Sequence, residues 1–346
     1  MDRVVWIDVA RGMSVALVVL YHSSLLLSQN GLGDPGWRDI DGALASLRMP
    51  LLFTVSGLLA GAALRRPWRS LWDSRLALLV WLVPLWAVLR FAAFSAVPMP
   101  VRPEETSVLR LIASPLLPTT GLWFLQALFA FLVLTKLAAG RVPPVWQLVI
   151  AAVISVAFFS GASLRNLGYD GIARYGVFFL VGVHGRDVLM RGFAVARPPL
   201  AVLAIAACIG LSVAVFRLGI GNQPAVGALV AAWATYTGLL VARTLAVTPL
   251  CAPFAYLGRN TLPVYVTHVV LIALLFPVVL RIGHAIPTVW WPVALGATVG
   301  GIALVIHKLV AGTPLRYLYL VPPFMLLPAT EGRAPLPVTV ARTPGS

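Results

Sequence analysis

Apolar residues run through this chain in ten long stretches, and short segments between them carry most of its charge. A helix of about 17–25 mostly apolar residues is long enough to cross a bilayer. We therefore predict an all-α protein, a polytopic transmembrane helix bundle with about ten spans. The predicted spans are Val4–Leu27, Leu47–Leu64, Leu76–Ala96, Leu117–Leu137, Val145–Phe159, Gly171–Met190, Pro198–Phe216, Ala225–Ala242, Asn260–Leu280 and Trp290–His307.

The composition agrees with a membrane protein. Of the 346 residues, 60% are hydrophobic and only 11% are charged, whereas a soluble domain carries about 25% charged residues. The net charge of +15 does not indicate nucleic-acid binding, because the arginines are scattered between apolar runs and form no basic face. The partner that this composition predicts is the lipid bilayer, with no nucleic acid.

Basic residues concentrate in the N-terminal segment and in alternate loops on its side, above all in the loop that holds Arg65, Arg66, Arg69 and Arg75. Cytoplasmic loops of membrane proteins carry the excess of Lys and Arg. We therefore predict a multi-pass protein of the cell (inner or plasma) membrane with both termini in the cytoplasm. Residues 1–310 form the predicted transmembrane domain, and residues 311–346 a short Pro-rich cytoplasmic tail.

The first predicted span carries three ionisable residues, Asp8, Arg11 and His22. At about 100° and 1.5 Å per residue, Arg11 and His22 lie about 20° apart around the helix and about 16 Å apart along it. Asp8 lies about 40° from His22 on the same side, one turn from Arg11. Ionisable residues at membrane depth usually face the bundle interior and mark functional sites, although Asp8 and Arg11 as an interfacial anchor are an alternative.

The spacing of Arg11 and His22 after Asp8 resembles the first helix of the acyltransferase-3 family of integral membrane acyltransferases, and most closely its sugar O-acetylase branch. Further segments resemble the motifs of this family, in the family's order. They are RMPLLFTVSGLL (Arg48–Leu59), the R-x-x-R pair Arg66 and Arg69, GLWFLQAL (Gly121–Leu128), RYGVFFLVG (Arg174–Gly182) and LGRNTLPVYVTH (Leu257–His268).

The resemblance implies transfer of an acyl group, in the sugar branch acetyl, from cytoplasmic acyl-CoA to a hydroxyl of an extracytoplasmic glycan or glycolipid. His22 is the candidate general base, since imidazole titrates near neutral pH; an acyl-histidine intermediate is the alternative. Arg11 would hold the donor or polarise its carbonyl, with Asp8 orienting it or making a plain salt bridge. Arg48 would stabilise the oxyanion, bind the acceptor or snorkel to lipid headgroups.

Residues for the two substrates are less sharply defined. Guanidinium groups match phosphate geometry, so we assign coenzyme A to the basic loop, although topology alone attracts arginine there. Tyr265 and His268 share one helix face and would line the donor channel, support His22 or join helices. For acceptor or acyl binding we single out Trp123, Arg174 and Asn260, against the alternatives of an interfacial belt, solvated loop charge and helix contacts.

No H-x-x-H, H-E-x-x-H or C-x-x-C spacing occurs, so we predict no metal. The alternative function is a multi-span transporter or flippase for a glycolipid or anionic metabolite, with the charged residues along its pathway. Transporters are often built from repeated halves, and we find no internal repeat. A sensor or scaffold without chemistry explains neither the buried charges nor their common face.

Overall fold

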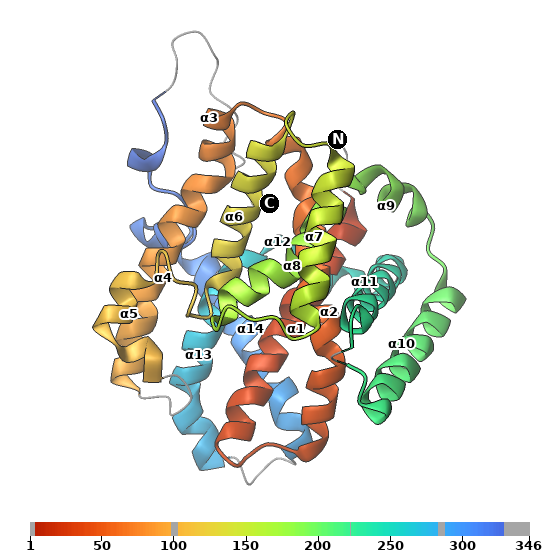
Figure 1. Cartoon of the computed structure of the whole chain (residues 1–346). Helices are drawn as coiled ribbons and strands as arrows, with labels where there is room; N and C mark the ends of the chain where they lie inside the picture. The colour runs from red at the N-terminus through yellow and green to blue at the C-terminus, as the bar shows by residue number, and fades with distance from the viewer. Residues whose placement is uncertain (1–3, 98–102, 222, 283–287, 329–346) are drawn as a thin grey trace.

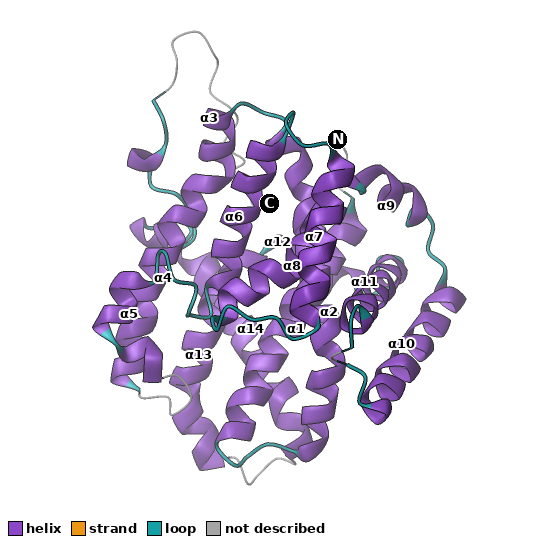
Figure 2. Ribbon diagram, viewed as in Figure 1, coloured by secondary structure: helices purple, strands orange, loops and turns teal. Residues whose placement is uncertain are grey.

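The computed structural model describes residues 4–97, 103–221, 223–282 and 288–328 (Figure 1). Within these residues the chain forms helices and loops and no strand (Figure 2), which confirms the all-α prediction. The α-helices are α1 (Val5–Gln29), α2 (Pro35–Leu64), α3 (Trp68–Leu71), α4 (Ala77–Ala96), α5 (Val108–Ala113), α6 (Trp123–Ala138), α7 (Pro144–Phe159), α8 (Leu167–His184), α9 (Arg186–Gly192), α10 (Pro198–Leu218), α11 (Val226–Leu245), α12 (Cys251–Arg259), α13 (Thr261–Ile282) and α14 (Trp291–Val310). The π- and 3₁₀-helices are η1 (Trp72–Leu76), η2 (Pro103–Thr106), η4 (Thr288–Trp290), η5 (Pro314–Leu318) and η6 (Pro323–Met325).

Nine of the ten predicted spans each coincide with one helix, and the sixth, Gly171–Met190, covers both α8 and α9. Seven helices in the described residues are long and apolar enough to cross a membrane. Two further apolar helices, α6 and α7, have 16 residues each. The protein is therefore a multi-pass membrane protein. The boundaries differ most in α2, which begins at Pro35 because the side chain of Asp34 caps it by accepting a hydrogen bond from the Gly36 amide at 2.8 Å.

Helix α1 lies at the centre of the bundle and contacts α2, α11, α12, α13 and α14. Its approach to α12 requires glycine, because a Cβ atom on Gly258 would overlap the backbone oxygen of Asp8 and one on Gly12 would overlap that of Phe254. Gly57 and Gly182 permit the same close approach between α2 and α8. Small residues at such crossings let transmembrane helices pack backbone to backbone, and this packing fixes the height and rotation of α1.

The ends of α2 and α6 lie together at the end of the bundle where the N-terminus lies (Figure 1). The Lys136 ammonium donates hydrogen bonds to the carbonyls of Leu64 and Arg66, at 2.8 and 2.7 Å. The loops predicted to be cytoplasmic by their basic residues thus gather at one end. Their orientation relative to the membrane stays a prediction.

The described part of the predicted tail, residues 311–328, packs along α4. Three indole N–H groups hold its backbone: Trp81 donates to Tyr317 O at 2.7 Å, Trp86 to Leu318 O at 2.8 Å, and Trp72 to Met325 O at 2.9 Å. Backbone carbonyls outside a helix need such donors wherever water is excluded. Helix α14 ends at Val310, and the packed part of the chain continues beyond it. The division into a transmembrane domain and a cytoplasmic tail stays a prediction.

Candidate functional site

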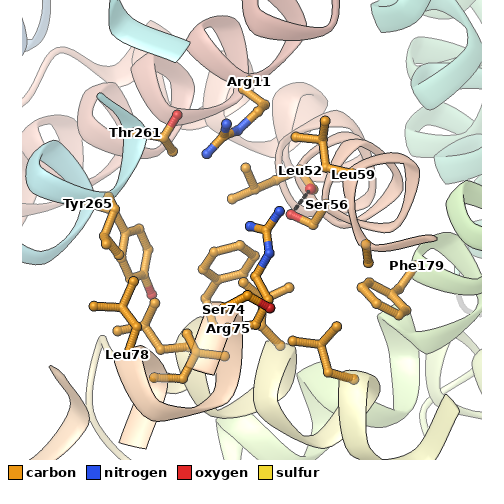
Figure 3. Close-up of a pocket in the computed structure, with 17 residues that line it drawn as sticks. Arg11, Leu52, Ser56, Leu59, Ser74, Arg75, Leu78, Phe179, Thr261 and Tyr265 are labelled. Carbon is orange, nitrogen blue, oxygen red and sulfur yellow. Dashed lines mark hydrogen bonds between the residues drawn. The ribbon is translucent and has the colours of Figure 1, made fainter. Parts of the chain in front are cut away.

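A cavity of about 160 Å³ lies inside the bundle, between α1, α2, α4, α6, α8 and α13. Two arginines, Arg11 of α1 and Arg75 of η1, point into it from opposite sides (Figure 3). The other polar groups on its wall are the side chains of Ser56, Ser74, Thr261 and Tyr265. The apolar lining residues are Leu52, Leu59, Ala60, Leu78, Leu79, Phe124, Leu125, Leu128, Leu132, Phe179 and Leu262. A mostly apolar chamber with two cations is suited to a ligand that is part anion and part alkyl chain.

The π-helix η1 (Trp72–Leu76) brings Arg75 into this cavity. One extra residue in a helical turn changes the direction of the side chains that follow, and such turns are frequent at functional sites. Arg75 belongs to the predicted donor-binding loop and is the one member of that group on the cavity wall. Arg65 and Arg66 are exposed outside it, and Arg69 is half-buried with its Nη2 atom buried and without a hydrogen-bond partner.

Asp8 and Arg11 occupy different surroundings although they lie one turn apart on α1. Asp8 is 5% exposed, at the crossing where α1 meets Gly258 of α12. Arg11 is half-buried and reaches the cavity beside Thr261. Asp8 and Arg11, which the sequence places on one side of α1, thus face the bundle interior. Exposing a charged side chain to lipid at membrane depth would be costly.

His22 meets His268 of α13 across the bundle. His22 Nδ1 lies 3.2 Å from His268 Nε2, and the ring centroids are 4.9 Å apart. Tyr265 lies one helical turn before His268 on α13 and lines the cavity, while its hydroxyl donates a 2.6 Å hydrogen bond to Gly121 O. Tyr265 therefore stands between the arginine cavity and the histidine pair.

Arg48 of α2 packs on Tyr21, next to His22 in the chain. Its guanidinium sits 4.0 Å above the ring of Tyr21, the neighbour of His22 in the chain. Its Nη2 donates to Asp41 O at 3.1 Å, and Nη1 lies 3.8 Å from the Asp41 carboxylate. Arg48 is only 6% exposed, yet Nη1 has no hydrogen-bond partner. A buried guanidinium nitrogen without a partner is costly, so this atom is poised to bind an oxygen of a ligand.

Of the three predicted substrate-binding residues, two make contacts that join helices and one bonds within its own turn. The Trp123 ring stacks on Tyr175, with centroids 6.2 Å apart, outside the cavity lining. Arg174 Nη2 donates to Phe158 O at 3.0 Å, linking α8 to α7. The Asn260 amide donates to Tyr256 O of its own turn at 2.9 Å. Their predicted roles stay predictions.

A buried ion pair near this site was not among the residues predicted from the sequence. Arg90 of α4 is 1% exposed, and its Nε and Nη2 atoms each donate a 2.8 Å hydrogen bond to the Glu105 carboxylate. Arg90 packs against Gly121, the residue that accepts the hydrogen bond from Tyr265. The signal was available, because Arg90 interrupts an apolar span in the same way as Arg11 does. Ser56 and Ser74 on the cavity wall carried no comparable signal.

No group of three or more His, Cys, Asp or Glu side chains gathers as a possible metal site in the part of the chain that the structure describes. The histidine pair has an arginine and aromatic rings around it. The prediction of chemistry without a metal stays a prediction.

The fold and the cavity with its two arginines define a multi-pass membrane protein with a polar site between its helices. The model of the acyltransferase domain family Acyl_transf_3 matches residues 4–307 of the chain. The chain therefore belongs to this family of membrane acyltransferases, and the resemblance seen in its motifs is confirmed.

Among curated proteins, the inner membrane protein YcfT of Escherichia coli (strain K12) is similar. The two chains are 25% identical over 234 residues, which is 60% of this chain and 65% of that relative. The match thus spans less than two thirds of the relative's length. No solved structure matches.

Proposed function

We propose that this protein transfers an acetyl group from cytoplasmic acetyl-CoA to a hydroxyl of an extracytoplasmic glycan or glycolipid. One observation carries the proposal: an apolar cavity with two arginines is lined by Tyr265, one helical turn from the His22–His268 pair. The family supports acyl transfer, and the relative named as an inner membrane protein supports location in that membrane.

The donor suits the cavity by its chemistry. Coenzyme A carries phosphates at one end and an uncharged pantetheine arm with the thioester at the other. Arg11 and Arg75 would bind the anionic part or polarise the thioester carbonyl, and the leucine and phenylalanine walls would hold the arm and the methyl group of the acetyl. The exposed Arg65 and Arg66 and the half-buried Arg69 would attract the anion to the mouth of the cavity.

The chemical step follows from the position of His22. Its imidazole takes the proton of the acceptor hydroxyl while that oxygen attacks the thioester carbon. The carbon–sulfur bond breaks, and the imidazolium returns the proton to the departing thiolate, so free coenzyme A leaves as the thiol. Arg48, with its unpartnered Nη1, would hold the acceptor or stabilise the negative oxygen of the tetrahedral intermediate.

The test is transfer of radiolabelled acetyl from acetyl-CoA to a glycolipid and glycan fraction by purified protein in nanodiscs. We expect label in that fraction, together with release of free coenzyme A, and loss of both in His22→Ala. Mass spectrometry of envelope glycans from a strain lacking the gene would identify the acceptor by the missing acetyl group. Protein that moves a substrate across the bilayer and never releases coenzyme A would contradict the proposal in favour of a transporter.

A further inference from the structure

Two histidine rings meet between α1 and α13, and their hydrogen bonds define which ring nitrogens carry hydrogen. His268 is 1% exposed, and its Nδ1 lies 2.6 Å from the backbone oxygen of Tyr265. A carbonyl oxygen only accepts hydrogen bonds, so Nδ1 of His268 must be the donor and carry the proton. In the neutral ring, the other nitrogen, Nε2, is then an acceptor.

His22 likewise faces hydrogen-bond acceptors. Its Nδ1 lies 2.9 Å from the backbone oxygen of Val18 and 3.2 Å from Nε2 of His268. Both neighbours are acceptors, so Nδ1 of His22 carries a proton that the two share. A second proton on His268 would set two N–H groups against each other across this 3.2 Å contact, which favours the neutral form of His268.

We propose that His268 is a positioning residue that, together with the Val18 carbonyl, fixes His22 as the Nδ1–H tautomer. The lone pair of His22 then lies on Nε2, and this is the atom that takes the proton from the acceptor hydroxyl. When it does so, the Nδ1–H bond to His268 stabilises the imidazolium. His268 acts through His22 and touches neither substrate. The inference rests on the proposed function for its chemistry, whereas the tautomer itself can be measured without any substrate.

The elements packed against α1 carry charged or titratable groups besides His268. Tyr21 packs edge-on beside His22 with centroids 5.1 Å apart, and Arg48 of α2 lies above Tyr21. The remaining groups are engaged in other contacts: Asp41 of α2 with Arg48, Tyr265 of α13 with Gly121, His307 of α14 with Tyr319, Arg243 of α11 with Phe193, and Arg259 of α12 with Tyr256. His268 is thus the group that meets the His22 ring at Nδ1.

If the His22–His268 contact only joined α1 to α13, substitutions of His268 would have other effects than if His268 positions His22. His268→Phe keeps a ring at this position but removes the acceptor, whereas His268→Gln keeps an acceptor oxygen near the place of Nε2. We expect kcat of His268→Phe to fall about 10–100-fold, by analogy with the loss caused by removing the hydrogen-bond partner of a metal-ligating imidazole, with KM for acetyl-CoA unchanged. His268→Gln should recover most of the rate.

The pH dependence provides a readout that a structural role would not move. Loss of one of the two acceptors at Nδ1 makes the His22 imidazolium less stable, so the acidic limb of the kcat/KM profile should move to lower pH in His268→Phe. In His268→Gln the limb should stay near its wild-type position. Equal losses in both variants, with an unmoved acidic limb, would overturn the positioning role.

Nitrogen-15 NMR of histidine-labelled protein tests the tautomer directly. We expect His22, assigned by the signal that disappears in His22→Gln, to be protonated at Nδ1 and bare at Nε2. A proton at Nε2 would overturn the inference while leaving acyl transfer itself intact. Conversely, the expected tautomer in a protein without transferase activity would contradict only the proposed function.

The matched control is His184→Gln. Nε2 of His184 hydrogen-bonds the side chain of Gln147 at 3.0 Å, a second contact between helices made by a histidine, away from the proposed site. This variant should keep the rate, the pH profile and the His22 signals of the wild type. If His268→Phe does not elute as a folded protein, His268→Gln and the NMR spectrum of the wild type still decide the question. A proton at Nε2 of His22 in that spectrum would overturn the inference.

Discussion

The arginine cavity and the histidine pair lie side by side in the bundle, yet they are built in opposite ways. The cavity is open space with two like charges, Arg11 and Arg75, on mostly apolar walls. Around His22 and His268 the chain is closely packed, and each ring contacts the other and a backbone carbonyl. Two guanidinium groups facing one chamber repel each other until an anion enters. A cavity of this kind binds a ligand, whereas a packed hydrogen-bonded pair holds reacting groups in place.

The largest effect should come from His22→Ala. Without a proton acceptor, transfer should fall at least about 10²–10⁴-fold, the range that general base catalysis contributes. Binding of coenzyme A should persist, because the cavity is intact. The rate of label transfer tests the expected loss of activity, and equilibrium binding of coenzyme A tests whether binding persists. Transfer at the wild-type rate would break the assignment of chemistry to the histidine pair.

Arg75→Ala should weaken donor binding. A hydrogen bond to a charged group contributes about 1.5–3 kcal/mol, so KM for acetyl-CoA should rise roughly 10–100-fold while kcat changes little. Arg141→Ala is the control, since Arg141 is an exposed cation that donates to Leu137 O. A fall in kcat at unchanged KM would move Arg75 from donor binding to the chemical step.

Gly258→Ala tests whether the crossing of α1 and α12 positions Arg11. The added methyl group would overlap the backbone oxygen of Asp8, and such overpacking costs about 1–3 kcal/mol. We expect a lower melting temperature in detergent and a higher KM. Gly300→Ala on α14 is the control, because nothing lies within 4 Å of its added Cβ. Equal stability of the two variants would contradict this packing.

Trp81→Phe should have the smallest effect. It removes one indole hydrogen bond to Tyr317 O, worth about 0.5–1.5 kcal/mol, and leaves both regions of the site unchanged. The melting temperature should fall slightly while kcat and KM stay the same. Trp146→Phe, at a 57% exposed position, is the control. A change in KM would show that the segment after α14 contributes to donor binding.

The sequence predicted the helices well because long apolar runs in this chain have few alternatives to a membrane-spanning helix. Arg11 and His22 could be placed on one stripe because their spacing alone sets the angle between them. The contact of His22 with His268 could only be suspected, because it joins helices far apart in the chain. The direction of Arg75 could not be predicted, since a π-helix shifts the register by one residue without a marker in the sequence.

Backbone contacts also escaped prediction. The carbonyls of Tyr317, Leu318 and Met325 have no side-chain signature, so the packing of the segment after α14 could not be read from its prolines. The early start of α2 could have been found, because Asp34 followed by Pro35 is a typical helix start. The predicted span began only at Leu47, because the polar turns of α2 before that residue do not belong to an apolar run.

The most direct test is equilibrium binding of coenzyme A to His22→Ala and Arg75→Ala, measured side by side with wild type. It shows whether the arginine cavity binds the donor while the histidine pair serves the chemical step. Our account predicts wild-type affinity for His22→Ala and an affinity roughly 10–100-fold weaker for Arg75→Ala. Wild-type affinity in Arg75→Ala, or loss of binding in His22→Ala, would contradict it.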